Sequence, residues 1–85
     1  MPRRRSVIAD VVDGLRAALD KDIADNADDI MTAHLPSHDV SVERTRWNTW
    51  AASIWPHDGG SVTHLRADTL HELKNAVATH VASRM

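Results

Sequence analysis

The 85-residue chain is predicted to be an α+β domain, with a helix near each end and an antiparallel β-hairpin between the helices. Two observations support this fold class. Near both ends, apolar residues recur at intervals of three and four, which is typical of amphipathic helices. Between them, a stretch rich in Val, Thr, Ile and Trp precedes a Pro-His-Asp-Gly-Gly segment, which is typical of a strand followed by a turn. We therefore expect one small domain at residues 6–85, preceded by a basic arm at residues 1–5.

The first predicted helix begins at Ser6, whose hydroxyl is a suitable N-cap. Large apolar residues then follow at intervals of four, three and four: Ile8, Val12, Leu15 and Leu19. These intervals place the apolar side chains on one face of a helix. We expect that face to pack against the rest of the domain.

A short second helix is predicted between the first helix and Pro36, with Asp25 or Asn26 as its cap. The apolar and aromatic residues that it carries are Ile30, Met31 and His34. Pro36 is expected to end this helix, because proline disfavours helical backbone in the residue before it. The alternative is one uninterrupted helix that continues as far as Leu35.

The segment from residue 41 to residue 56 is compatible with either a helix or a strand. A helix would gather one arc of residues, namely Trp47, Trp50, Ala51 and Ile54. The β-branched and aromatic content, with two glycines at positions 59 and 60, favours a strand, a turn and a second strand. We therefore prefer a hairpin. Residues around Val40 and Val42 either add a third short strand or extend the first.

The hairpin separates its residues into two faces. If residues 57–60 form the turn, Ile54 lies opposite Thr63 and Trp55 lies opposite Val62. One face is then suited to the core: Trp50, Ala52, Ile54, Thr63, Leu65 and Ala67. The other face carries residues expected to meet solvent: Trp47, Thr49, Ala51, Ser53, Trp55, Val62, His64 and Arg66.

The last helix is predicted from a capping box, in which the Thr69 hydroxyl accepts from the backbone N–H of Glu72. Apolar residues follow at helical spacing: Leu70, Leu73, Val77 and Val81. We expect this C-terminal helix and the N-terminal helix to pack on one face of the sheet, as in other α+β domains.

Composition excludes several classes of protein. The chain contains no cysteine, so it forms neither disulfides nor thiolate zinc sites. Its apolar runs are far shorter than the about 20 residues that span a membrane. Asp10 and Asp13 interrupt the apolar stretch that a signal peptide needs, so we expect a cytoplasmic protein. Twelve of the 36 apolar residues are alanine, and so thin a core favours binding to a partner.

The histidines do not have the spacing of a metal site. His34 and His38 are separated by Pro36, and His71 and His80 lie on opposite sides of the last helix. The sequence also lacks a glycine-rich phosphate loop and a serine nucleophile motif. We therefore expect no metal, no cofactor and no enzymatic activity.

The outer face of the hairpin is the candidate binding site. Its residues expected to contact a partner are Trp47, Trp55, His64 and Arg66. Tryptophan and arginine are enriched in binding hot spots, because each buries a large area and has a directional polar group. The expected partner is another protein, or a second copy of the chain in a homo-oligomer.

Two alternatives remain open. A nucleic-acid-binding protein would use Arg3, Arg4 and Arg5 as a basic arm that contacts phosphates. The net charge of −2 argues against this as the main activity, since nucleic-acid binding depends on neutralising phosphates. The other alternative is a structural component of a virion or another assembly.

The composition also indicates a source. Arginine outnumbers lysine eight to two, and aspartate outnumbers glutamate ten to two. With its abundant alanine, the chain resembles small accessory proteins of high-GC actinobacteria and their bacteriophages. The sequence therefore leads to a non-enzymatic, protein-binding accessory module, encoded by or derived from a phage.

Overall fold

The computed structural model describes residues 3–23 and 30–83, with side chains from residue 9 onward. Its elements, in chain order, are α1 (Arg3–Asp22), β1 (Ile30–His34), β2 (His38–Arg44), β3 (Trp50–Pro56), β4 (Thr63–Ala67) and α2 (Leu70–Ser83). The predicted α+β class is confirmed, because two helices flank a four-stranded antiparallel sheet in the sequence.

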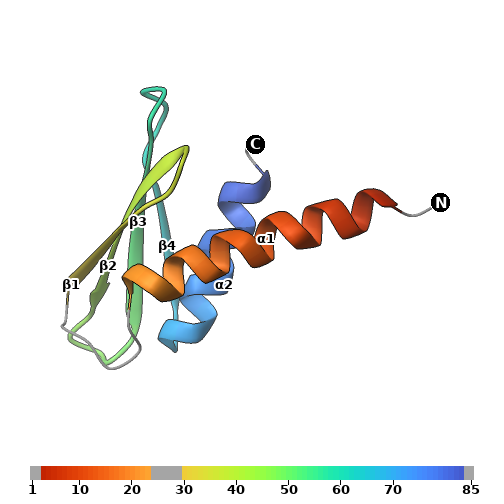
Figure 1. Ribbon diagram of the computed structural model, residues 1–85. Coiled ribbons are helices and arrows are strands. Elements are labelled where there is room, and N and C mark those ends of the chain that lie inside the picture. The colour runs from red at the N-terminus through yellow and green to blue at the C-terminus, as the bar shows by residue number, and fades with distance from the viewer. Residues whose placement is uncertain (1–2, 24–29, 84–85) are drawn as a thin grey trace.

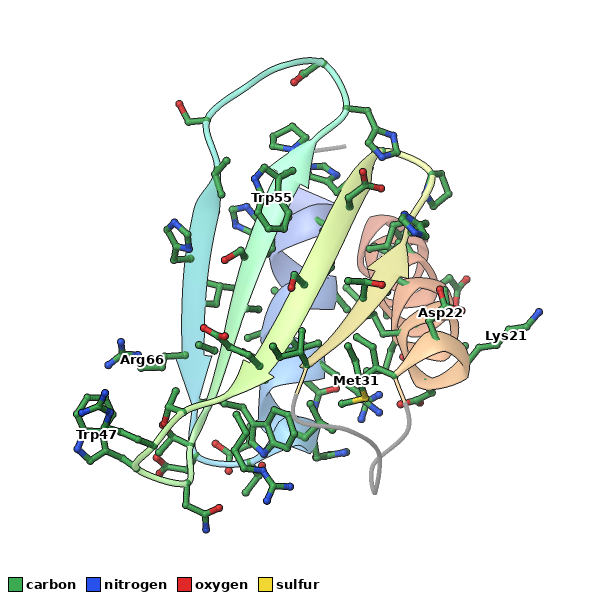
Figure 2. The ribbon with its side chains drawn as sticks, turned by 90° about the vertical axis from the view of Figure 1, so that its left-hand side faces the viewer. Lys21, Asp22, Met31, Trp47, Trp55 and Arg66 are labelled. Atoms are coloured by element: carbon green, nitrogen blue, oxygen red, sulfur yellow. The ribbon has the colours of Figure 1, made fainter. Side chains whose placement is uncertain are left out.

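The strands form a meander in which each strand pairs with the next, in the order β1-β2-β3-β4. Ile54 pairs with Thr63, which is the predicted register of the hairpin. Both helices lie on one side of the sheet (Figure 1). The opposite side of the sheet faces the viewer in Figure 2, with the helices behind it.

The predicted short second helix is wrong, because residues 30–34 form strand β1. The burial along β1 alternates: Met31 and Ala33 are buried, whereas the residues on either side of them are exposed. This period of two matches the pairing of Met31 with Val42 and of Ala33 with Val40 in β2. The predicted caps, Asp25 and Asn26, lie outside the described residues.

Helix α1 begins at Arg3, earlier than the predicted N-cap at Ser6. Its backbone therefore includes the three arginines that we assigned to an arm in front of the helix. At 20 residues the helix is about 30 Å long. Its N-terminal half extends away from the sheet, and the molecule measures 46 Å along its longest axis (Figure 1).

The helical alternative for residues 41–56 is wrong, because this segment contains the end of β2 and all of β3. Val40 and Val42 lie in β2, which is a separate strand. A tight turn from Thr45 to Thr49 joins β2 to β3. Trp47 lies in this turn and not on the strand where the sequence pattern placed it.

The core lies between the sheet and the two helices, and we call this side of the sheet the covered face. Leu19 of α1, Ile54 of β3 and Leu73 of α2 are among its fully buried residues. The capping box at the start of α2 is confirmed, since the backbone N–H of Glu72 donates to the Thr69 hydroxyl at 3.1 Å. This hydrogen bond fixes the start of α2, and the start of the helix determines which of its side chains face the sheet.

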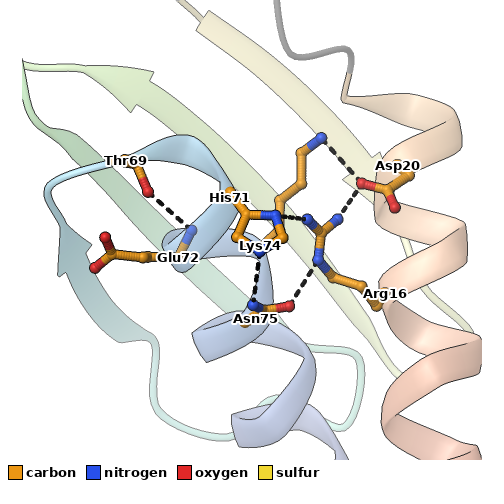
Figure 3. A network of polar contacts seen from close by, with 7 residues as sticks. All are labelled: Arg16, Asp20, Thr69, His71, Glu72, Lys74 and Asn75. Carbon is orange, nitrogen blue, oxygen red and sulfur yellow. Dashed lines mark hydrogen bonds and ion pairs between the residues drawn. The ribbon is translucent and has the colours of Figure 1, made fainter.

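A polar network joins the two helices beside this core (Figure 3). The Arg16 guanidinium donates to Asp20 and, at 2.8 Å, to the side-chain oxygen of Asn75. Lys74, which is 2% exposed, places its Nζ 3.1 Å from an oxygen of Asp20. Desolvation acts in the opposite direction, but hydrogen bonds from Lys74 and Arg16 hold the pKa of Asp20 below its usual value.

Neither described helix combines the length and the apolar character that crossing a bilayer requires.

Candidate functional site

The side of the sheet away from the helices has a distinct composition, and we call it the open face. It consists of the strand residues that alternate with the core residues: Ile30, Thr32, His34, Asp39, Ser41, Glu43, Ala51, Ser53, Trp55, His64 and Arg66. Neither α1 nor α2 covers this face, because both lie behind the sheet (Figure 2). It is therefore available to another molecule.

Small residues in the middle of the open face form the floor of a hollow of about 440 Å³. Ala51 and Ser53 of β3 are part of this floor. Glu43 of β2 and Arg66 of β4 line it on the two sides, because both pair with Ala51 across the sheet. The floor of this hollow is partly apolar and partly hydroxyl, and an acid and a base stand at its sides. Such a hollow can receive a protruding side chain of another molecule.

Large apolar side chains are also exposed on the open face and in the loops beside it. Among the described residues, those of substantial exposure are Ile30 at 65%, Trp47 at 70%, Trp55 at 43% and Val62 at 39%. Trp55 lies toward one end of β3, and Trp47 lies in the turn at the other end (Figure 2). Exposed tryptophans at both ends of one strand mark a candidate interaction surface.

The turn that carries Trp47 is held by several hydrogen bonds. The backbone N–H of Thr45 donates to the carbonyl of Thr49 at 2.8 Å, and their hydroxyls lie 2.7 Å apart. Asn48 has a φ of 61°, a left-handed conformation that asparagine tolerates better than most residues. The Arg46 guanidinium lies 5.7 Å from the centre of the Trp47 ring, within cation–π distance. The turn thus holds an exposed aromatic ring and a cation together.

A histidine–aspartate cluster lies at the Trp55 end of the open face. Nδ1 of His34 and Nε2 of His57 lie 3.0 and 2.9 Å from the same oxygen of Asp39. The hydrogen bond to Asp39 raises the pKa of His34, and the same contact lowers the pKa of Asp39. Asp39 pairs with Trp55 across β2 and β3, so these charges lie beside the tryptophan.

The charges of the open face differ between β2 and β4, the two strands that lie on either side of β3. Strand β2 presents the acids Asp39 and Glu43, and β4 presents His64 and Arg66. The structure gives neither Glu43 nor Arg66 an ion pair within the described part of the chain. These two charges are therefore available to bind groups on another molecule.

The structure brings three of the four predicted partner-binding residues together on the open face: Trp55, His64 and Arg66. Trp47 lies apart from them in the β2–β3 turn. The predicted basic arm, Arg3, Arg4 and Arg5, belongs to the first turn of α1, and its side chains lie outside the described residues.

Strands β1 and β2 contribute side chains to this face that were not predicted from the sequence to belong to it. Strand β1 adds Ile30 and His34, and β2 adds Asp39 and Glu43. Alternation of apolar and polar residues from 38 to 44 was a visible signal for β2. The corresponding signal for β1 was hidden, because its apolar residues also fit a helical period.

A second hollow, of about 600 Å³, lies beyond the end of the sheet near the β3–β4 loop. It is lined by imidazoles from three parts of the chain: His38, His57 and His80. Across the described ranges, no three histidine, aspartate or glutamate side chains are arranged to hold a metal ion.

Comparisons of the chain with protein-family models, with curated proteins and with solved structures find no match.

Proposed function

We propose that this protein is a non-enzymatic accessory module that binds a protein partner through its open face. One observation carries the proposal: Ile30 and Trp55 are exposed on the same side of the sheet as the hollow, and Trp47 and Val62 are exposed in the loops at the two ends of β3. Monomeric proteins rarely leave such a surface without a binding role. A bacteriophage or actinobacterial source is part of this proposal and is supported by the amino-acid composition.

The residue types support a protein as the partner. Trp55 supplies a wide, rigid contact area, and it lies next to small residues that let a partner approach the sheet closely. Arg66 and Glu43 supply opposite charges at the sides of the hollow. An apolar centre with charges at its edge resembles the anatomy of protein–protein interfaces.

A nucleic-acid partner is less well supported. Asp39 and Glu43 place two carboxylates along β2, in the path that a phosphate backbone would take across the face. The chain as a whole carries a net charge of −2. The observation in favour of nucleic acid is Arg46 beside Trp47, an arrangement that can stack a base. A role in a virion or another assembly would use the same open face.

The test is affinity capture by the immobilised protein from a lysate of a GC-rich actinobacterium, followed by direct binding of the captured protein after purification. Trp55→Ala should weaken binding at least tenfold, since hot-spot tryptophans contribute about 2 kcal/mol or more. Ser53→Arg should fill the hollow and abolish binding. Thr79→Arg, at an exposed position of α2 on the other side of the molecule, is the matched control.

Equal binding by wild type, Ser53→Arg and Trp55→Ala would contradict the proposal. Circular dichroism of each variant should show the wild-type fold, because the substituted side chains lie outside the core. A parallel measurement uses a single-stranded oligonucleotide at increasing salt concentration. Binding that falls steeply with salt and disappears when residues 2–5 are deleted would support the nucleic-acid alternative instead.

A further inference from the structure

The open face has an acidic side and a basic side, separated by β3. Glu43 and Arg66 occupy the same row of the sheet, since each pairs with Ala51 from a neighbouring strand. Two strand spacings, or about 10 Å, separate their backbones. In the row above, Ser41 and His64 flank Ser53 in the same way. The face therefore carries a carboxylate on β2 and a guanidinium on β4 in one row, and a hydroxyl and an imidazole on the same two strands in the next row.

A surface with this pattern is complementary to itself. Rotation by 180° about an axis parallel to β3, and just above it, turns the open face toward an identical one. This rotation places β2 of each copy over β4 of the other. It leaves the position of each residue along the strand direction unchanged. Each Glu43 carboxylate then faces the Arg66 guanidinium of the second copy, and the same contact occurs twice.

We propose that the open face pairs with the open face of a second copy of this chain, with Glu43 of each copy opposite Arg66 of the other. This inference rests on the proposed function, because it names the partner that the face binds. The small side chains of Ala51 and Ser53 lie along the axis. They allow two sheets to approach to about 10 Å, the usual spacing of packed sheets.

The charges select this arrangement over the other face-to-face one. An axis across the strands would place β2 over β2, and Glu43 would then face Asp39 of the second copy. Facing carboxylates repel each other, whereas the axis along β3 pairs unlike charges. With that axis the two Trp55 rings also meet close to it, where an offset stack is favourable.

The size of the shared surface predicts a weak dimer. Three strands overlap, and strands of five to seven residues give each copy a contact of roughly 300 Å² in projection. Even with the relief of the side chains, this lies at the low end of specific interfaces. We therefore expect a dimer that dissociates on dilution.

The experiment is sedimentation equilibrium of the full chain over a wide range of concentrations. The wild type should change from monomer to dimer as its concentration rises. Glu43→Arg and Arg66→Glu should each weaken dimerisation at least tenfold, because each substitution places like charges opposite each other at two sites. Thr79→Arg, which lies on the helical side, should dimerise like the wild type.

Mixing the two charge variants provides the decisive measurement. A Glu43→Arg chain and an Arg66→Glu chain have complementary charges in both contacts, so an equimolar mixture should form dimers although neither variant does so alone. The double variant, E43R with R66E, should also recover dimerisation. A misfolded variant would not recover in a mixture, so recovery separates charge pairing from damage to the fold.

Three outcomes would overturn the inference: a wild type that stays monomeric, charge variants that dimerise like the wild type, or a mixture that does not recover. The failure of this inference is distinguishable from the failure of the proposed function. If the wild type is monomeric but Ser53→Arg abolishes binding of a captured protein, self-pairing fails and the proposed function stands. If no open-face variant changes binding to itself or to another protein, both fail.

Discussion

The two faces of the sheet are made from the same four strands, yet they differ in almost every property. On the covered face, Val40, Ala52 and Ile54 are fully buried beneath the helices. On the open face, their neighbours Ser41 and Ser53 line a hollow. Because side chains alternate along a strand, each short segment contributes to both faces. The difference indicates that the covered face supplies the stability of the fold and that the open face is available for recognition.

This division has a measurable consequence, since neighbouring residues of one strand should respond differently to substitution. A truncation on the covered face leaves a cavity in the core and lowers the free energy of unfolding. A truncation on the open face removes little buried area and should alter association instead. Comparison of matched pairs of residues therefore tests whether stability and recognition are separate.

The largest contrast is expected between Trp50 and Trp47. Trp50 is 7% exposed in the core, and the Arg44 guanidinium lies 5.0 Å from its ring, whereas Trp47 is 70% exposed in the turn. Trp50→Ala should lower the free energy of unfolding by about 3–5 kcal/mol. Trp47→Ala should lower it by less than about 1 kcal/mol. Urea denaturation of the two variants provides the measurement, and equal losses would show that the turn is part of the stabilising core.

The next contrast lies between two consecutive residues of β3. Ile54 is 1% exposed, and its truncation to alanine should cost about 2–5 kcal/mol. Ser53 lies on the open face, with its hydroxyl 3.0 Å from Nδ1 of His64. Ser53→Ala should change the free energy of unfolding by about 0.5 kcal/mol or less. If Ser53→Ala destabilised the protein as much as Ile54→Ala, the two faces would not be separable.

These contrasts also show what the sequence made predictable. The β3–β4 register, with Ile54 opposite Thr63, followed from the length of the turn and from alternation. The start of α2 followed from the capping box of Thr69 and Glu72. Each of these two signals is formed by residues that lie close together along the chain. Local patterns of this kind were sufficient for the hairpin, the last helix and three residues of the open face.

The errors arose where distant residues decide the structure. Met31 and Ala33 form a strand because β2 lies beside them, and the sequence of β1 alone also fits a helix. Trp47 shares a helical arc with Trp50, and in a continuous strand it would lie on the face opposite Trp50. Hydrogen bonds between Thr45 and Thr49 turn the chain there, and they leave Trp47 outside the strand. The hollow itself depends on the pairing of three strands, which no single segment of sequence contains.

The covered side is not wholly apolar, and its polar network provides a smaller test of the comparison. Lys74 is buried and depends in part on Asp20 for a hydrogen-bond acceptor. Asp20→Asn removes a charged acceptor and should cost about 1–2 kcal/mol at neutral pH. Because the pKa of Asp20 is held below its usual value of 3.8, Asp20 stabilises the fold when it is ionised. The difference between wild type and variant should therefore shrink as the pH falls below about 4, and urea denaturation at several pH values would measure it. A difference that did not depend on pH would show that the charge of Asp20 has no part in stability.

The smallest expected effect concerns the exposed cluster beside Trp55. The hydrogen bond to Asp39 raises the pKa of His34 above 6.5, and the hydrogen bonds from His34 and His57 lower the pKa of Asp39 below 3.8. A raised histidine pKa stabilises the fold below about pH 6.5, and this contribution is lost as the pH rises through the folded-state pKa. A lowered aspartate pKa stabilises the fold above about pH 4, and this contribution is lost as the pH falls. Both contributions are therefore present together between about pH 4 and pH 6.5.

NMR titration of the imidazole of His34 tests this cluster directly. Asp39→Asn should return the pKa of His34 toward its ordinary value, because the charged acceptor is lost. The free energy of unfolding should change little, because the cluster is exposed to solvent. A pKa of His34 that was the same in wild type and variant would contradict the cluster. A large loss of stability in Asp39→Asn would instead show that the open face, like the covered face, holds the fold together.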